Sequence, residues 1–154
     1  MSAKVVVAEA IADAGVAALR QEFEVDVAIG LDPEELADRL RDADALIVRS
    51  ATTVDRSLIE AAPGLQVIGR AGIGVDNIDL AAATERGVLV VNAPHANTIS
   101  AAEHAMALLL AQARNGPRAH GTLTAGVWDR KSFQGVELHG KTIGIVGLGK
   151  IGTL

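Results

Sequence analysis

The sequence predicts an α/β fold, a parallel sheet of five strands followed by the start of a second strand–helix–strand unit. Two observations predict the sheet: short β-branched runs alternate with helical patterns as far as Asn92, and the links between them are short. A third observation predicts the second unit. The apolar run Thr142–Val146 leads directly into a glycine-rich turn.

The predicted strands share short, largely apolar and β-branched sequences, as expected for strands buried in a parallel sheet. They are Val5–Ala8, Glu24–Ala28, Ala45–Val48, Gln66–Ile68 and Val88–Val91. Helical patterns fill the intervals at Ala10–Gln21, Pro33–Asp42, Arg56–Ala62 and Leu80–Arg86. Such an order predicts a sheet that is covered by helices on both faces.

Two of these helices carry clear end signals. Asp32 can cap the second helix, with Pro33 at its first position and acidic residues in its first turn. Gly87 follows the fourth helix and is typical of a helix stop.

The alternation ends after Asn92, and a second domain is predicted there. Ser100 and Glu103 form a Ser-x-x-Glu capping box, which predicts a helix from Ala101 to about Arg114. Asn115-Gly116-Pro117 ends it, a second helical stretch runs to about Ala125, and an irregular arm, Trp128–Phe133, follows. We place the domains at residues 1–98 and 99–154.

The glycines of Gly147-Leu148-Gly149-Lys150-Ile151-Gly152 have the spacing of a dinucleotide-binding turn. Gly147 permits the tight turn, Gly149 lets the backbone approach a pyrophosphate, and Gly152 lets the helix pack on the strand. A glycine-rich loop without a ligand is the alternative. Because the sequence given ends at Leu154, we expect the unit to be truncated within its first strand–helix–strand segment.

Composition excludes several classes of protein. The chain has 154 residues, no cysteine and a formal net charge of −5, which argue against a disulfide framework, a cysteine–zinc site and a nucleic-acid surface. No apolar run is long enough for a membrane helix. The histidines lack the spacing of a metal site, so no metal is expected. We expect a cytoplasmic protein that binds neither nucleic acid nor membrane.

Polar residues follow three predicted strands at the edge where ligands bind in open parallel sheets. They are Arg49-Ser50-Ala51-Thr52, Arg70-Ala71-Gly72-Ile73-Gly74 and Asn92-Ala93-Pro94-His95-Ala96-Asn97. Arginine suits a carboxylate or phosphate, so Arg49 and Arg70 are predicted to converge on one anionic ligand. Alternatively, the two arginines pair with acids such as Asp76 or cover helix ends.

Five segments in this order resemble one enzyme family. They are Val48–Thr52, Gly69–Asp79, Val91–Pro94 with Asn97, Ser100–His104, and Gly140–Thr142 leading to Gly147–Gly152. Together they resemble the D-isomer-specific 2-hydroxyacid dehydrogenases, over nearly the whole chain. The resemblance implies a flavodoxin-like substrate domain and a Rossmann domain that binds NAD, with a homo-oligomer formed largely through the latter.

The resemblance also implies roles for individual residues. Arg49, Ser50 and Arg70 would hold the phosphate and carboxylate of 3-phosphoglycerate, Asn97 would contact the substrate, and Arg130 would reach the substrate of a neighbouring subunit. Gly147, Gly149, Lys150, Ile151 and Gly152 would lie on the cofactor pyrophosphate, and Ile73 would contact NAD through its backbone. Lys150 stands where the family commonly has Arg.

The function implied is oxidation of D-3-phosphoglycerate to 3-phosphohydroxypyruvate, the first step of serine biosynthesis. The family's catalytic Arg, Glu and His would lie beyond Leu154, so no catalytic residue is assigned and this piece alone is expected to be inactive. Two alternatives stay open. The chain could be a non-catalytic anion-binding or dimerisation module, or part of a sister enzyme acting on glycerate, formate or lactate.

Overall fold

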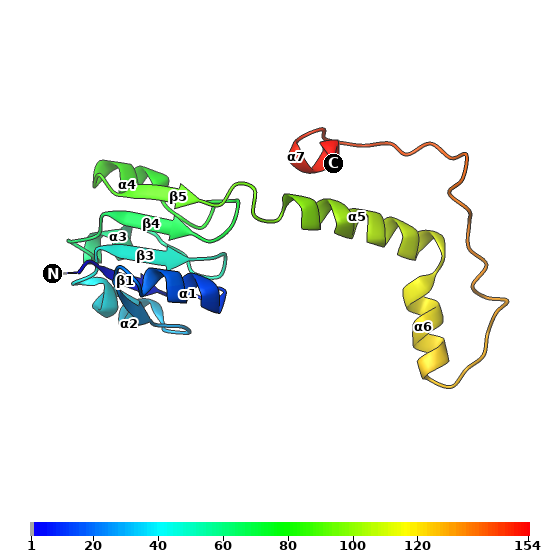
Figure 1. Ribbon diagram of the computed structural model, residues 1–154, viewed down its shortest axis with the longest axis horizontal. Helices are drawn as coiled ribbons and strands as arrows, with labels where there is room; N and C mark the ends of the chain where they lie inside the picture. The colour runs from blue at the N-terminus through cyan, green and yellow to red at the C-terminus, as the bar shows by residue number, and fades with distance from the viewer. Residues whose placement is uncertain (1) are drawn as a thin grey trace. The chain divides into compact units, whose positions relative to one another are not determined.

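Five parallel strands form one sheet in the order β2-β1-β3-β4-β5, in a computed structural model that describes residues 2–154. The strands are β1 (Lys4–Val7), β2 (Glu24–Val27), β3 (Ala45–Val48), β4 (Val67–Arg70) and β5 (Leu89–Asn92) (Figure 1). This is the flavodoxin-like order. The predicted α/β fold is therefore confirmed, with strand limits that differ from the predicted ones by at most two residues.

The register of the sheet brings three of the predicted strand ends side by side. Val48 of β3 pairs with Arg70 of β4, and Arg70 pairs in turn with Asn92 of β5. Arg49 is the first residue after β3. The carboxyl ends of β3, β4 and β5 therefore form one continuous edge.

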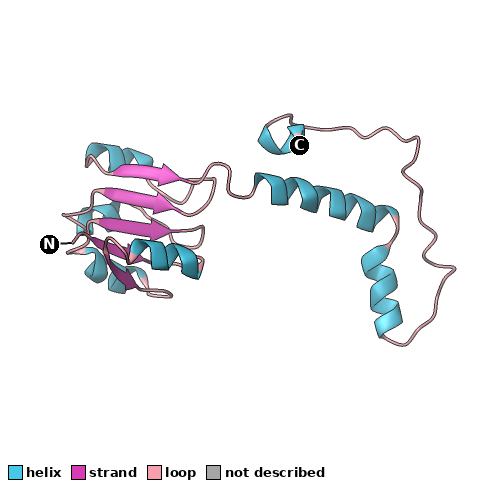
Figure 2. Cartoon of the chain, viewed as in Figure 1, coloured by secondary structure: helices cyan, strands magenta, loops and turns pink. Residues whose placement is uncertain are grey.

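The helices of the sheet unit are α1 (Asp13–Leu19), α2 (Pro33–Leu40), α3 (Arg56–Ala61) and α4 (Leu80–Glu85) (Figure 2). The connections that contain α2, α3 and α4 all progress across the sheet in one direction, whereas the connection through α1 runs the other way. Because such crossovers are right-handed, α1 lies on one face and the other three helices on the opposite face.

The main hydrophobic core lies between the sheet and α2, α3 and α4. Its fully buried large side chains include Leu46 of β3, Ile68 of β4 and Ile59 of α3. The other face carries only α1 within this unit, so Leu89 and Val91 of β5 stay 60% and 43% exposed. The prediction of helices over both faces is thus wrong for the β5 half of the α1 face.

Aspartates cap three of these helices. Asp32 and Glu35 form a reciprocal capping box at α2, which confirms the predicted start. Asp55 accepts a hydrogen bond from Leu58 N–H, and Asp79 accepts one from Ala82 N–H. Each side chain satisfies an N–H group that the first turn leaves without an intrahelical partner.

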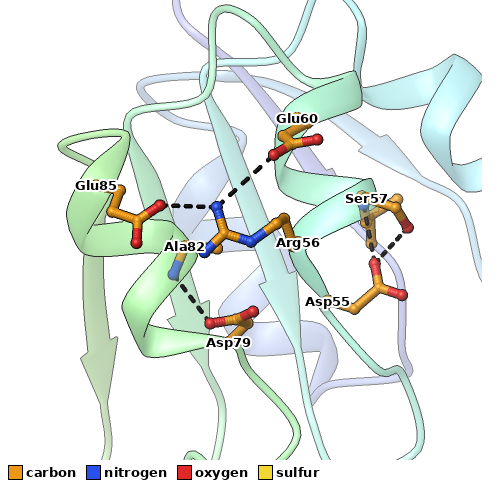
Figure 3. A network of polar contacts seen from close by, with 8 residues as sticks. Asp55, Arg56, Ser57, Glu60, Asp79, Ala82 and Glu85 are labelled. Carbon is orange, nitrogen blue, oxygen red and sulfur yellow. Dashed lines mark hydrogen bonds and ion pairs between the residues drawn. The ribbon is translucent and has the colours of Figure 1, made fainter.

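Arg56 joins α3 to α4 at the surface. Its Nη1 lies 2.7 Å from Glu85 Oε2 and 3.7 Å from Glu60 Oε1 (Figure 3). The hydrogen bond and charge of Arg56 lower the pKa of Glu85 below its ordinary value. Both side chains are about half exposed, so solvent screens the pair.

We therefore predict that a capping aspartate matters more than this ion pair. Asp79→Ala should lower the free energy of unfolding by about 1 kcal/mol, because Ala82 N–H loses its acceptor. Arg56→Ala, the comparison variant, should lower it by less. Urea denaturation followed by circular dichroism measures both values. A larger loss for Arg56→Ala would contradict this ranking.

Residues Asn97–Leu154 form a second compact unit, and the sheet unit ends at Ala96. The second unit contains α5 (Thr98–Ala113), α6 (Gly116–Thr124) and α7 (Lys150–Thr153), with α7 packed on α5. Between α5 and α6, Asn115 adopts a left-handed conformation with φ of 54°, which separates the two helices. No helix in residues 2–154 is long and apolar enough to cross a membrane.

Two sequence predictions in the second unit are wrong. The helix α5 starts at Thr98 with Asn97 as its N-cap, so Ser100 and Glu103 lie inside the helix and form no capping box. Residues 142–146 form no strand. A strand needs a neighbour for its N–H and C=O groups, and none of the described residues pairs with this segment.

Candidate functional site

The loop that follows β3 is held in place by two side chains from elsewhere in the sheet unit. Glu9, two residues after the end of β1, accepts hydrogen bonds from the N–H groups of Arg49 (2.8 Å), Ala51 (3.2 Å) and Thr52 (2.9 Å). Asn77 donates from Nδ2 to the carbonyl oxygens of Arg49 (2.9 Å) and Thr52 (2.6 Å). Five backbone groups of this short loop therefore have side-chain partners.

The carboxylate of Glu9 is the charged member of this arrangement. Burial raises its pKa, but hydrogen bonds from the N–H groups of Thr52, Arg49 and Ala51 and from the Thr52 side chain together outweigh burial, so the net pKa is lowered below its ordinary value of 4.5. The ionised form is therefore more favourable in the folded chain than in the unfolded chain.

A pH dependence of stability follows from this shift. A carboxyl group with a lowered pKa in the folded state stabilises the fold above its ordinary value of 4.5 and loses that contribution as the pH falls below it. Glu9→Gln should thus lower the urea midpoint at neutral pH and differ less from the parent chain in acid. A difference that stays constant across this range would contradict the assignment.

The side chain of Arg49 lies at a cavity on the β1 side of the loop. The cavity has a volume of about 850 Å³, and its lining includes Glu9, Arg49, Thr52 and Asp55. It lies beside the ends of β1 and β3, the two strands at which the direction of the strand order reverses. That switch point is where open parallel sheets bind ligands. Arg49 Nη1 makes one long hydrogen bond of 3.5 Å, to Ala10 O, and Ser50 is exposed.

Arg70, the last residue of β4, folds back over Gly72. A Cβ atom built at Gly72 would overlap Arg70 Nη1, so only glycine leaves room for the guanidinium group in this position. Arg70 Nε is buried and has no hydrogen-bond partner among the residues that the structure describes. Arg70 lines a separate, open hollow of about 540 Å³ together with Gly69 and Asn92.

The two arginines are therefore at neighbouring strand ends but line different hollows. Neither one forms an ion pair within 4.0 Å in the described part of the chain, so the alternative in which they pair with acids such as Asp76 is not observed. Their convergence on one ligand stays a prediction.

The loop after β4 is tied to β5. Asn92 donates a 2.6 Å hydrogen bond from Nδ2 to the carbonyl oxygen of Ile73, and Ala93 N–H donates to Gly72 O. The backbone of Ile73 is thus partly used within the sheet unit. Its predicted contact with NAD is not tested by this arrangement.

Asn97 and Arg130 both belong to the second unit. Asn97 caps α5 by position, without a side-chain hydrogen bond to the helix, and both residues are exposed. The arm that carries Arg130 leads to Val136, and the N–H group of Val136 donates a 2.9 Å hydrogen bond to Ala113 O in α5. Their predicted substrate contacts stay predictions.

The glycine-rich turn has the backbone features that the sequence pattern requires. Gly147 has a φ of 96°, a conformation that favours glycine. A Cβ atom at Gly152 would overlap Gly147 O, whereas none of the described atoms lies within 4 Å of one built at Gly149. The turn is therefore tight at Gly147 and Gly152 and open at Gly149, beside Lys150 and Ile151.

Glu9 and Asn77 are the site residues that sequence reasoning missed. Glu9 directly follows the predicted strand Val5–Ala8, so it lies at the same edge as the other strand-end residues. This position after a predicted strand could have indicated Glu9 as a candidate site residue. Asn77 lies within the segment Gly69–Asp79, but nothing in its spacing indicates a bond to the loop after β3.

Comparison with known proteins identifies the family. The sequence profile of the D-isomer specific 2-hydroxyacid dehydrogenase catalytic domain matches residues 5–143. The chain is 54% identical to D-3-phosphoglycerate dehydrogenase of Methanocaldococcus jannaschii over 149 residues, which cover 97% of this chain and 28% of that protein. The chain thus spans less than a third of the length of this curated relative.

Two solved structures have the same fold. The NAD⁺-bound 3-phosphoglycerate dehydrogenase of Entamoeba histolytica is 30% identical with a TM-score of 0.78, over 99% of this chain and 49% of that one. The NADPH-dependent glyoxylate/hydroxypyruvate reductase of Sinorhizobium meliloti is 29% identical with a TM-score of 0.81, over 99% and 48%. This chain belongs to the family of D-isomer specific 2-hydroxyacid dehydrogenases.

Proposed function

We propose that this chain is the substrate-binding part of an NAD-dependent enzyme that oxidises D-3-phosphoglycerate to 3-phosphohydroxypyruvate. One observation carries the proposal. Within residues 2–154, Arg49 and Arg70 lie at neighbouring strand ends without a carboxylate partner, in a chain 54% identical to a D-3-phosphoglycerate dehydrogenase. Two arginines suit a substrate with both a phosphate and a carboxylate.

In this proposal Arg49, Ser50 and Arg70 bind the two anionic groups of the substrate. Arg70 lines an open hollow and has no ion pair in residues 2–154, which supports its role. Asn97 contacts the substrate, and Arg130 reaches the substrate of a second subunit in a homo-oligomer. The protein would act in the cytoplasm.

The glycine-rich turn is proposed to hold NAD. The tight backbone at Gly147 and Gly152 and the open space at Gly149 fit a pyrophosphate lying against the turn. Bound NAD would supply the acceptor for the hydride that leaves the substrate. The chain's own contribution is to orient the substrate acid through its arginines.

A chimera tests the proposed reaction. In it, this chain replaces the 149 matched residues of the Methanocaldococcus jannaschii enzyme, which provides the remainder of a dehydrogenase. We expect NAD-dependent oxidation of D-3-phosphoglycerate, followed by NADH absorbance. A folded chimera that binds NAD but does not oxidise this substrate would contradict the proposal.

The same chimera separates the sister activities. Because two arginines favour a doubly anionic substrate, kcat/KM should be higher for D-3-phosphoglycerate than for D-glycerate, which lacks the phosphate. Equal values would favour a glycerate or hydroxypyruvate enzyme like the reductase from Sinorhizobium meliloti.

The 154-residue chain by itself is expected to show no turnover and no NAD affinity tighter than millimolar. Residues 142–146 have no strand to pair with, and helix α7 after the glycine-rich turn spans only Lys150–Thr153. The described chain therefore provides little regular structure to hold the glycine-rich turn in a conformation that binds NAD. Calorimetric titration with NAD measures this, and micromolar binding would contradict it.

A further inference from the structure

The N–H groups of the loop after β3 converge on a single point, which Glu9 occupies. Three donors, from Arg49, Ala51 and Thr52, reach its two carboxylate oxygens at 2.8–3.2 Å. Backbone N–H groups grouped in this way form an anion-binding concavity. In this chain the anion is part of the protein.

A neutral side chain cannot replace this carboxylate. The ionised group offers only acceptors, on both oxygens, whereas an amide of the same shape offers one acceptor and one NH₂ donor. With glutamine at position 9, that NH₂ group would face a loop N–H. No ion pair of Glu9 with a cation is present in residues 2–154, so hydrogen bonds from the loop, mainly its N–H groups with the Thr52 side chain, stabilise its charge.

The position of Glu9 gives this contact a consequence for ligand binding. β1 and β3 are the strands at which the strand order reverses, the usual place for a ligand in such a sheet. Because Glu9 takes the N–H groups of Arg49, Ala51 and Thr52, an external phosphate or carboxylate cannot bind to these three groups. The side chains of Arg49 and Ser50, and the Ser50 N–H that Glu9 does not hold, are left to bind an anion.

We propose that Glu9 is a positioning residue, an internal anion that fixes the Arg49–Thr52 loop so that Arg49 and Ser50 bind the substrate acid. The effect on substrate binding rests on the function proposed above, whereas the effect on the loop does not. Asn77 completes the arrangement by donating to the loop carbonyl oxygens of Arg49 and Thr52.

The loop is tested first, in the 154-residue chain without any substrate. Glu9→Gln should shift the ¹H–¹⁵N resonances of the Arg49, Ala51 and Thr52 amides and raise their exchange rates. Glu34→Gln is the matched control, because Glu34 lines the same cavity and its side chain makes no hydrogen bond or ion pair within residues 2–154. Unchanged amide resonances in Glu9→Gln would overturn the proposal.

Substrate binding is tested in the chimera. Glu9→Gln should raise KM for D-3-phosphoglycerate about tenfold or more and change kcat much less, because the loop affects binding rather than hydride transfer. Acetate or formate should restore a low KM to Glu9→Ala, by occupying the vacated N–H groups, but not to Glu9→Gln. An unchanged KM, or a Glu9→Ala variant that carboxylates do not rescue, would overturn the proposal.

These results also separate the failure of this inference from that of the proposed function. If a parent chimera that folds and binds NAD fails to oxidise D-3-phosphoglycerate, the proposed function is wrong. The amide resonances then still decide whether Glu9 holds the loop. If Glu9→Ala does not fold, Glu9→Gln keeps the packing volume and provides the result.

Discussion

Arg70→Ala in the chimera is expected to lower kcat/KM for D-3-phosphoglycerate by about 30-fold to several thousand-fold, equivalent to about 2–5 kcal/mol. The physical reason is the loss of a guanidinium group that no carboxylate of the described chain neutralises. Arg70→Lys should recover little of the activity, because an ammonium group lacks the planar fork that binds two oxygens. Steady-state kinetics with each variant measures the effect.

Arg86→Ala is the control for this prediction. Arg86 lies at the end of α4, is exposed and has no ion pair in residues 2–154. Its loss changes the net charge by the same amount as the loss of Arg70 and should leave kcat/KM close to that of the parent. If Arg70→Ala behaved like Arg86→Ala, Arg70 would not bind the substrate.

The largest expected effect on stability is that of Leu46→Ala in the central strand β3. Leu46 is fully buried between the sheet and its helices, so truncation removes transfer free energy and leaves a cavity. The free energy of unfolding should fall by about 2–5 kcal/mol.

Leu89→Ala is the matched comparison, because Leu89 is also a strand leucine but is 60% exposed. Its truncation should cost much less in the 154-residue chain. Urea denaturation of both variants provides the test. If Leu46→Ala and Leu89→Ala lowered the free energy of unfolding equally, the core would not lie on the side of the sheet that α2, α3 and α4 cover.

The sheet could be predicted from the sequence because its signals are local. Runs such as Val5–Ala8 and Ala45–Val48 are short, apolar and separated by helical patterns, and all five predicted strands form. The strand order was not available from such patterns and came with the family resemblance. Uncovered strand residues such as Leu89 were missed because the face of each helix depends on that order.

Errors arose where a local signal needed a distant partner. Residues 142–146 have the composition of a strand, yet no described segment pairs with them. Glu9 illustrates the same limit, because its hydrogen bonds join positions 40 or more residues apart. The error at Ser100 and Glu103 is of a different kind: the two residues match a capping box, but α5 begins two residues earlier, at Thr98, and encloses both.

The candidate site was predictable to the level of strand ends. Arg49 and Arg70 follow from the rule that ligands bind beyond the carboxyl ends of parallel strands, and the register places these ends side by side. The directions of their side chains were not predictable, because they depend on neighbours such as Gly72 and Ala10.

A crystal structure of the chimera with D-3-phosphoglycerate and NAD tests most directly whether these two arginines recognise the substrate. We predict that the guanidinium groups of Arg49 and Arg70 both lie within hydrogen-bond distance of the substrate's phosphate or carboxylate oxygens. A bound substrate that neither guanidinium group contacts, or one held instead by the loop N–H groups after β3, would contradict the account.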